Sequence, residues 1–419
     1  MTESKFQFAF RALRHRNYRL FFIGQSMSLI GTWMTQVATS WLVYRLTNSA
    51  FLLGIVGFSG QLPAFLLTPF AGVWVDRLNR HTVLKWTQFF SMLQSFSLAA
   101  LTLSGRVNIW HIAALMMFQG VVNAFDMPAR QTFVIEMIQD RADLPNAIAL
   151  NSSMLNGSRL IGPSIAGAII AIAGEGYCFL IDGFSYLAVI GSLFLMHIQA
   201  GPRRLHENIW LELQEGLGYI REFVPIRSIL TLLAVLSFAG APYSVLLPVF
   251  ARTILHGGPN TLGFLTAATG IGALISAVTL AVRRTVVGLG RIMKITSFTF
   301  GAGLIVFALS RSFPLSLVLL LGCGFSMMLS YSSGNTIVQT IVDEGKRGRV
   351  MSFYTLAIIG IQPFGSLLSG MMADRVGAPP TVIIGGTMII LCSIWFARKL
   401  HEIRTIVRPI YRELGILPD

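Results

Sequence analysis

The sequence contains few charged residues: 12% of its 419 residues are Asp, Glu, Lys or Arg, against roughly 25% in an ordinary soluble domain. Hydrophobic residues make up 54%, and the mean hydropathy is +0.67. A soluble core of this length cannot remove so much apolar surface from water, whereas a lipid bilayer solvates it. The composition therefore excludes a soluble globular protein and indicates an integral membrane protein.

Cysteine and the common catalytic motifs are also scarce. Cys178, Cys323 and Cys392 lie in apolar runs without a CxxC or Cys/His cluster, which excludes a disulfide framework and a zinc site. Gly288-Leu-Gly290 lacks the lysine of a P-loop, which argues against an ATP-driven pump. The sequence has no catalytic triad, metal cluster or dinucleotide fingerprint, so we expect no enzymatic activity, cofactor or metal. The basic start, Met1 to Arg19, lacks a cleavage-site pattern and is interpreted as a retained cytoplasmic segment.

Acidic residues are outnumbered by basic ones, 18 to 32, which gives a net charge of +14. Such an excess can indicate nucleic-acid binding, but the placement of the basic residues favours a membrane protein. With both termini inside, all but six Lys and Arg residues fall on the cytoplasmic side; the exceptions are Arg45, Arg106, Arg252, Arg311 and Arg375 outside and Arg159 within a helix. The positive-inside rule therefore predicts cytoplasmic termini, and no nucleic-acid partner is needed.

Twelve apolar stretches are long enough to span a bilayer, which takes about 20 residues. They are 19–44, 51–75, 83–104, 109–138, 147–173, 177–199, 227–251, 260–283, 290–310, 314–341, 348–373 and 379–399. The polar stretch between the sixth and seventh has Trp210, Leu213, Leu217 and Ile220 at helical spacing, which predicts an amphipathic surface helix. We therefore predict an all-α membrane protein with an N-terminal six-helix bundle (1–199), a cytoplasmic linker (200–226), and a C-terminal six-helix bundle with a cytoplasmic tail (227–419).

An internal repeat supports two pseudo-symmetric halves. A shift of 209 residues places Leu53-Gly54 on Leu262-Gly263, and Asn123, Asp126 and Arg130 on Ser332, Asn335 and Gln339. A shift of about 200 places Pro163 on Pro363. The matches together indicate duplication of a six-helix unit.

The loop after the second predicted helix carries the pattern GxxxDRxxR in Gly72, Asp76, Arg77 and Arg80. Here the sequence resembles the major facilitator superfamily, whose signature occupies this loop. The resemblance implies the twelve-helix fold of that superfamily and a charge network that latches helices 2, 4 and 11 on the cytoplasmic side. Glu136, near the cytoplasmic end of helix 4, is the expected partner of Arg80, and Gly72 is expected to permit close helix packing.

The fifth predicted helix contains Gly162, Pro163 and Gly167 and is similar to the GxxxGPxxGG pattern of exporters in that superfamily. Proline removes a helical hydrogen bond, and small residues permit close approach. The segment either seals a leak path and bends there, or is a packing face without directional meaning. Together with the run Asn123–Gln131, it resembles the branch that contains the enterobactin exporter and macrolide efflux proteins.

The fourth predicted helix carries a polar stripe at spacings of four, three and four: Gln119, Asn123, Asp126 and Arg130. Charged residues within membrane helices usually face a cavity or a partner. Asp126 and Arg130 are an i,i+4 pair that can neutralise each other. Asp126 is therefore either a proton or substrate site, or one member of a brace that holds the helix to its neighbours.

Other polar side chains are candidates to line a central cavity opposite this stripe. These are Gln25, Trp33 and Gln36 on helix 1, Tyr243 on helix 7, and Tyr331, Asn335 and Gln339 on helix 10. For the uncharged groups the alternative is interhelical hydrogen bonding alone. Asp182, near the outer end of helix 6, is expected to meet interfacial water.

The sequence as a whole predicts a multi-pass bacterial inner-membrane exporter that works by alternating access. The proton gradient is the expected energy source, and the substrate is expected to be a small amphipathic molecule such as a siderophore or drug. The expected partners are that substrate, protons and membrane lipids, and a monomer is the expected functional unit. The alternatives are a lysophospholipid or other lipid transporter, a non-transporting membrane receptor or scaffold, and an intramembrane enzyme.

Overall fold

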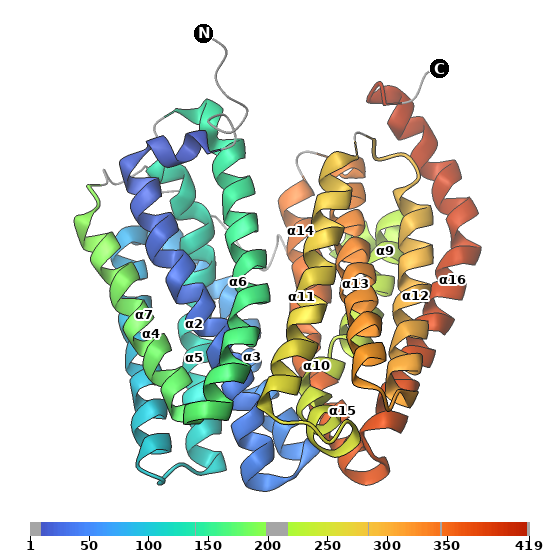
Figure 1. Ribbon diagram of the computed structural model, residues 1–419. Helices are drawn as coiled ribbons and strands as arrows, with labels where there is room; N and C mark the ends of the chain where they lie inside the picture. Colours follow the sequence, from blue (N-terminus) through green and yellow to red (C-terminus); the bar gives the residue numbers. More distant parts are fainter. Residues whose placement is uncertain (1–9, 139, 198–216, 284, 344–345, 417–419) are drawn as a thin grey trace. The chain divides into compact units, whose positions relative to one another are not determined.

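Helices make up all the regular structure in the part of the chain that is described. The computed structural model describes residues 10–138, 140–197, 217–283, 285–343 and 346–416, without the side chains of Pro69, Val73, Asp76 and Arg141. Every regular element within those residues is a helix, which confirms the predicted all-α class (Figure 1).

Six long helices occupy the described part of the first half of the chain. After the short 3₁₀ helix η1 (Arg11–Arg14) they are α2 (Arg16–Thr47), α3 (Ala50–Arg77), α4 (Arg80–Leu103), α5 (Ile109–Met137), α6 (Leu144–Ala173) and α7 (Glu175–Leu195), with η2 (Arg141–Asp143) before α6. Helix α7 packs along both α2 and α4, and α5 packs on α4. Asn79 and Asn108 cap α4 and α5, accepting hydrogen bonds from the backbone N–H groups of Thr82 and His111.

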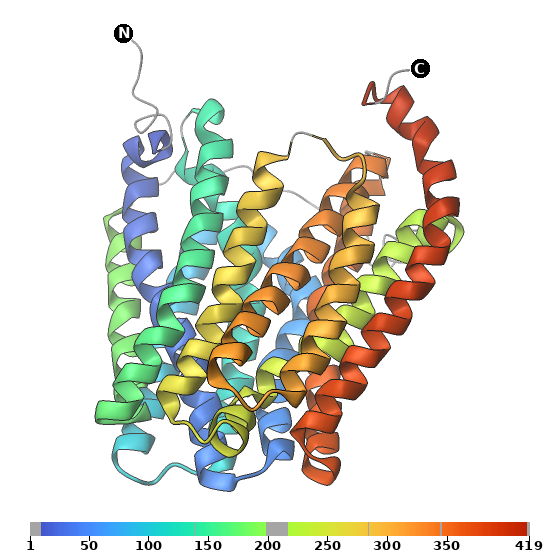
Figure 2. The same cartoon turned by 45° about the vertical axis from the view of Figure 1, so that its right-hand side comes forward.

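The second half forms its long helical segments partly from shorter pieces. They are α9 (Val224–Val235), η3 (Leu236–Gly240), α10 (Tyr243–Val249), η4 (Phe250–Ile254), α11 (Pro259–Val282), α12 (Leu289–Leu309), α13 (Phe313–Ile341), α14 (Arg347–Thr355), η6 (Leu356–Gly360), α15 (Gln362–Val376) and α16 (Ala378–Glu413). Helix α12 packs between α13 and α16, and the three run side by side in both views (Figures 1 and 2).

Two π-helical turns interrupt these segments just before a proline. Turn η3 precedes Pro242 and turn η6 precedes Pro363, and the carbonyls four residues before these prolines belong to Phe238 and Ile359, inside the turns. A proline ring clashes with that carbonyl and cannot donate a hydrogen bond to it, so the helix widens locally. The Ser237 hydroxyl donates to the Ile358 carbonyl oxygen and joins the two turns.

Two sharp connections occupy matching places in the two halves. Gly174, between α6 and α7, and Gly377, between α15 and α16, both have a φ of +91°. Only glycine adopts that conformation without a steric penalty, because any other residue would bring a Cβ against the backbone. The match adds a backbone feature to the repeat seen in the sequence.

The chain divides into two compact units. Unit 1 comprises Met1–Asn48, Ser59–His206 and Gly257–Ala267; unit 2 comprises Ser49–Phe58, Glu207–His256 and Ala268–Asp419. The first turns of α3 thus belong to unit 2, and the first turns of α11 belong to unit 1. The boundaries predicted at residues 199 and 227 stay a prediction. Most of the predicted linker lies outside the described residues, which show a helix only over 217–222.

Among the described residues, ten helical segments are long and apolar enough to cross a membrane, and α2 and α4 are the two long helices that fall short. Both carry polar side chains that are buried inside unit 1: Gln25, Ser28, Thr35 and Thr39 on α2, and Thr87, Gln88, Ser91, Gln94 and Ser95 on α4. The low hydropathy of these two helices therefore reflects their inward faces. Large apolar side chains on other helices are strongly exposed, Ile172 to 87% and Val282 to 76%, as expected where lipid is the neighbour.

The predicted helix limits agree with the structure to within about four residues, except for the last helix. The apolar pattern predicts an end at residue 399, but α16 continues to Glu413. The apolar window marks only the membrane span. Beyond it the helix continues with Ile403, Val407 and Tyr411 buried at a helical spacing.

Helix α13 offers a matched pair of glycines that tests close helix packing in unit 2. A Cβ at Gly324 would collide with the backbone carbonyl of Thr269 on α11, whereas one at Gly322 would meet nothing within 4 Å. We expect Gly324→Ala to destabilise the protein by about 1–3 kcal/mol, because the backbones must separate. Gly322→Ala should leave stability unchanged or raise it slightly, since alanine has the higher helix propensity. Thermal unfolding in detergent measures both, and equal melting temperatures would contradict the close crossing.

Candidate functional site

A buried carboxylate lies at the centre of the polar stripe of α5. Asp126 is 3% exposed. Its Oδ1 accepts hydrogen bonds from Thr87 Oγ1 at 2.8 Å and from Gln88 Nε2 at 2.7 Å, both on α4. Its Oδ2 is ion-paired with Arg130, one turn along the same helix. The sequence therefore placed the two charges correctly with respect to each other, while their role in function stays a prediction.

The two carboxylate oxygens have different partners, which determines the chemistry available to them. Neutral donors hold Oδ1, and a cation holds Oδ2. A proton on Oδ2 would compete directly with the guanidinium of Arg130, so proton uptake and the ion pair exclude each other.

Arg130 retains hydrogen-bonding capacity beyond this pair. Its side chain is 29% exposed, and its buried Nε has no hydrogen-bond partner among the described residues. Since an unpaired buried donor is costly, the guanidinium is suited to bind a further acceptor when the site opens.

The rest of the stripe is more open than Asp126. Gln119 Nε2 donates to Ser91 Oγ at 3.0 Å and to Asn123 Oδ1 at 3.1 Å. Gln119 is half-buried, and Asn123 is exposed. The stripe thus changes along α5 from accessible amides to a buried ion pair.

Unit 2 repeats the geometry of the pair without its charge. On α13, Gln339 Nε2 donates to Asn335 Oδ1 at 2.7 Å. These are the residues that the internal repeat superposes on Arg130 and Asp126. The i,i+4 contact is therefore present in both halves, as an ion pair in one and as an amide pair in the other.

The remaining candidates for a cavity lining lie in different surroundings. Gln25 is buried and Gln36 exposed, while Trp33 lies beneath the guanidinium of Arg159, 5.4 Å from the centre of its ring. Tyr243 is buried in unit 2 against Phe300, with its hydroxyl 3.4 Å from Thr269 Oγ1. The backbone carbonyl of Tyr331 accepts a hydrogen bond from the Tyr354 hydroxyl. Of these residues, Gln36 is the one whose side chain is openly accessible.

Two of the predicted latch residues form an ion pair in the described part of the structure. Arg80 Nη1 lies 2.7 Å from Glu136 Oε1, both half-buried, as the sequence predicted. Arg77 is exposed, and the side chain of Asp76 lies outside the described part of the structure. A Cβ at Gly72 would meet no described atom within 4 Å, and the close packing expected there stays a prediction.

The glycines of α6 lie at close helix crossings. A Cβ at Gly162 would come within 2.6 Å of Trp33 Cβ on α2, and one at Gly167 within 3.0 Å of Asn260 Cα at the start of α11. Pro163 lies inside α6, which the structure shows as one continuous helix. The small residues thus allow α6 to pack closely against α2 and α11. A bend at Pro163 stays a prediction.

The sequence interpretation missed the two neutral donors to Asp126. Thr87 and Gln88 start a second polar stripe, which continues with Ser91, Gln94 and Ser95 at spacings of three and four. The same spacing test that found the stripe of α5 would have found this one. A polar stripe on each of two neighbouring helices predicts that the stripes face each other.

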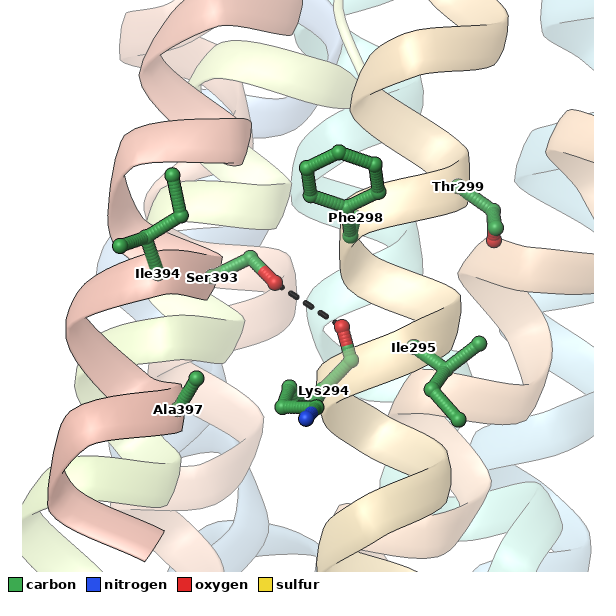
Figure 3. A pocket seen from close by; sticks show the side chains of 7 residues that line it. All are labelled: Lys294, Ile295, Phe298, Thr299, Ser393, Ile394 and Ala397. Carbon is green, nitrogen blue, oxygen red and sulfur yellow. Dashed lines mark hydrogen bonds between the residues drawn. The ribbon is translucent and has the colours of Figure 1, made fainter.

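A cavity of about 300 Å³ lies elsewhere, between α12 and α16 (Figure 3). Seven residues line it: Lys294, Ile295, Phe298, Thr299, Ser393, Ile394 and Ala397. Ser393 Oγ donates to the backbone carbonyl of Lys294 at 2.9 Å. The lining is mostly apolar and contains none of the predicted site residues, so we do not assign the transport chemistry to it.

Comparison with known families matches almost the whole chain. Residues 7–406 match the family described as transmembrane secretion effector. Because this match covers far more than half of the chain, it bears on the protein as a whole.

Individual relatives are similar over nearly their full length. The chain is 25% identical to the staphyloferrin A transporter of Staphylococcus aureus (strain NCTC 8325 / PS 47), covering 90% of this chain and 95% of that protein. It is 27% identical to the multidrug efflux pump Tap of Mycolicibacterium fortuitum, with the same coverage. It is 25% identical to macrolide efflux protein A of Streptococcus pyogenes, covering 93% and 98%.

Solved structures share the fold at low sequence identity. A POT family transporter in complex with a thioalcohol conjugated peptide superposes with a TM-score of 0.75 at 12% identity, covering 93% of this chain and 96% of that one. The nucleoside transporter NupG gives a TM-score of 0.70 at 14% identity, covering 93% and 99%. At these identities the likeness establishes the fold alone.

The ion pair between Arg80 and Glu136 predicts strong coupling between these residues. We expect Arg80→Gln and Glu136→Gln each to destabilise the protein by about 1–3 kcal/mol, because each removes one charge of a half-buried ion pair. The double variant should be no less stable than either single variant. A double-mutant cycle of thermal unfolding measures the coupling, with Lys399→Gln and Glu402→Gln as the exposed control pair. Strictly additive losses of stability in the two single variants would show that the ion pair contributes no coupling energy.

Proposed function

Because the chain belongs to the transmembrane secretion effector family of the major facilitator superfamily, we propose that it exchanges protons for a small amphipathic molecule at the Asp126–Arg130 pair. The chain is a multi-pass secondary transporter that exports small molecules, and its family is one of transporters rather than enzymes. The proton coupling and the site are the proposed steps. The single observation that carries them is a buried carboxylate whose Oδ2 is held by Arg130.

Exchange transport requires two ligands that exclude each other at one site, and Asp126 meets that requirement. With the ion pair intact, a proton has no free position on Oδ2. When the pair separates, the carboxylate accepts either a proton or a hydrogen-bond donor of the substrate, but not both. Thr87 and Gln88 hold Oδ1 in either case, so the carboxyl stays in place while its partner changes.

The accessible part of the stripe supports a substrate path toward this pair. Asn123 is exposed, and Gln119 joins it by a hydrogen bond. Gln25, Trp33 and Gln36 in unit 1, and Tyr243, Tyr331, Asn335 and Gln339 in unit 2, stay proposed groups that orient the substrate, each described within its own unit. Arg80, Glu136 and the neighbouring residues Gly72, Asp76 and Arg77 form the proposed latch, and Gly162, Pro163 and Gly167 the proposed bending point of α6.

The membrane, orientation and assembly belong to the proposal as well. Bacterial relatives and the distribution of basic residues favour the inner membrane with both termini in the cytoplasm. A monomer suffices, because one chain supplies both repeats, and lipids are the expected neighbours of the exposed apolar faces. The names of the relatives favour a siderophore or a drug as the exported molecule.

Proteoliposomes with an imposed pH gradient test the proposal. The probes are staphyloferrin A, a macrolide and a lysophospholipid. We expect Asp126→Asn to reduce gradient-driven transport to the level of protein-free liposomes, because the amide keeps hydrogen bonds but cannot bind a proton. Exchange of labelled for unlabelled probe without a gradient should continue.

Glu402→Gln, which removes an exposed carboxylate from α16, is the matched control and should transport normally. Full gradient-driven transport by folded Asp126→Asn would remove Asp126 from the coupling step. Transport of the lysophospholipid alone would favour the lipid-transporter alternative.

A further inference from the structure

The cavity between α12 and α16 in unit 2 takes no part in the proposed transport chemistry. We call it the α12–α16 groove; it has a volume of about 300 Å³ and is lined by the seven residues labelled in Figure 3. Its apolar walls are open to the surroundings, since Ile295, Phe298 and Ile394 are between 42% and 47% exposed. In a membrane such walls contact lipid chains, so the groove is accessible to a lipid.

Two glycines bring the helices together at one end of the groove. A Cβ at Gly301 on α12 would lie 2.7 Å from the carbonyl oxygen of Gly386 on α16, and a Cβ at Gly386 would lie 2.7 Å from that of Gly301. About two turns closer to the N-terminus of α12, a side chain joins the helices instead, because Ser393 Oγ donates to the carbonyl of Lys294. The backbones are therefore further apart there, and the space between them is the groove.

The end of the groove away from this crossing is basic on α12. Lys294 lines the groove, and its side chain extends toward the end where Ala397 lies (Figure 3). Arg291 is exposed and lies one turn earlier, on the helix face that carries Lys294 and Phe298. Within the part of the chain that is described, neither Arg291 nor Lys294 forms an ion pair. Both cations are therefore available to an anion at this end.

The same end is basic on α16. Arg404 and Arg408 follow Ala397 by about two and three helical turns, so the face that lines the groove becomes basic beyond it. Both arginines are exposed, and no described acidic residue pairs with them. A Cβ at Gly290 would lie 2.9 Å from Leu400 Cδ1, which puts the start of α12 level with this part of α16. The basic groups of the two helices thus gather at one end of the groove.

Apolar walls that lead to a basic end fit an anionic phospholipid. An acyl chain packs on the walls, and the phosphate accepts hydrogen bonds from the basic groups. A lysine ammonium at the edge of a membrane needs water or a counter-ion, and a phosphate supplies the counter-ion. Basic pockets between membrane helices recognise anionic headgroups in this way. A zwitterionic phospholipid has the same chains but carries its own cation, so it gains less from this site.

We propose that the α12–α16 groove binds one anionic phospholipid, whose phosphate contacts Lys294 and Arg291 and whose acyl chain lies against Phe298. The groove is at the small end of the range for ligand pockets, so it admits one chain rather than several. Arg404 and Arg408 add positive charge around the headgroup. The lipid is a bound partner of unit 2 and not the exported molecule, because the groove contains none of the proposed transport residues.

Native mass spectrometry of the detergent-purified protein tests the proposal by counting bound lipids during a titration. The probes are phosphatidylglycerol and phosphatidylcholine with identical acyl chains. We expect the wild type to bind one phosphatidylglycerol in preference to phosphatidylcholine. Lys294→Gln should weaken that binding roughly fivefold, the contribution of one lysine at an anionic membrane surface. Lys294→Arg should keep the affinity, because it keeps the charge.

Ala397→Phe tests the groove itself, because it fills the space between the helices without changing the charge. It should weaken the binding of phosphatidylglycerol. If this variant does not fold, Phe298→Ala, which removes part of one wall, takes its place with the same expected result. Arg347→Gln is the matched control for charge, since it removes an exposed cation of α14 outside the groove, and it should bind as the wild type does.

Three results would overturn the proposal. The first is equal affinity of the wild type for the two lipids, which would exclude recognition of the headgroup charge. The second is equal weakening by Lys294→Gln and Arg347→Gln, which would show an effect of net charge alone. The third is unchanged binding in the folded groove variant, which would place the lipid elsewhere. None of these measurements involves transport, so a failure of the proposed export function is recorded separately.

Discussion

The ion pair between Asp126 and Arg130 is the constraint around which unit 1 is arranged. A charge removed from water inside a membrane must be neutralised and hydrogen-bonded, or the helix that carries it is unstable there. Arg130 supplies the opposite charge, and α4 supplies two neutral donors. The polar faces of α4 and α5 must therefore meet, and this fixes the rotation of both helices about their axes.

The two halves of the chain share one side-chain contact, but only the first half has charged residues in it. Asn335 and Gln339 on α13 make the same i,i+4 contact as Asp126 and Arg130. An amide pair satisfies its own hydrogen bonds without titrating, so it holds a side-chain arrangement but cannot carry a proton. The proposed proton chemistry therefore involves unit 1 alone, while unit 2 keeps groups suited to hydrogen bonding.

The sequence predicted best those features that depend on a single helix. Helix limits followed from apolar windows, and the contact of Asp126 with Arg130 followed from their spacing along α5. Neither requires knowledge of a neighbouring helix. The end of α16 was missed because its last turns leave the apolar window while remaining helical.

Features that depend on the rotation and neighbours of a helix could not be predicted in the same way. The prediction that Asp182 meets interfacial water was wrong, because the sequence did not show that Thr35 and Ser95 face it from two other helices. Gly72 belongs to a recognisable motif, yet its surroundings depend on which elements come close to that face. Thr87 and Gln88 are an intermediate case. Their helical spacing could be recognised in the sequence, but their orientation toward Asp126 could not.

The low hydropathy of α2 and α4 has a consequence for how the protein enters the membrane during synthesis. Each helix exposes several hydrogen-bonding groups until its neighbours are in place, so partitioning of either one alone into lipid is weakly favoured. Thr87 and Gln88 gain their partner only when α5 arrives, and Thr35 and Ser95 only when α7 does. Stable insertion of the early helices therefore awaits translation of the later ones, and a chain truncated before α7 should be a preferred target for membrane quality control.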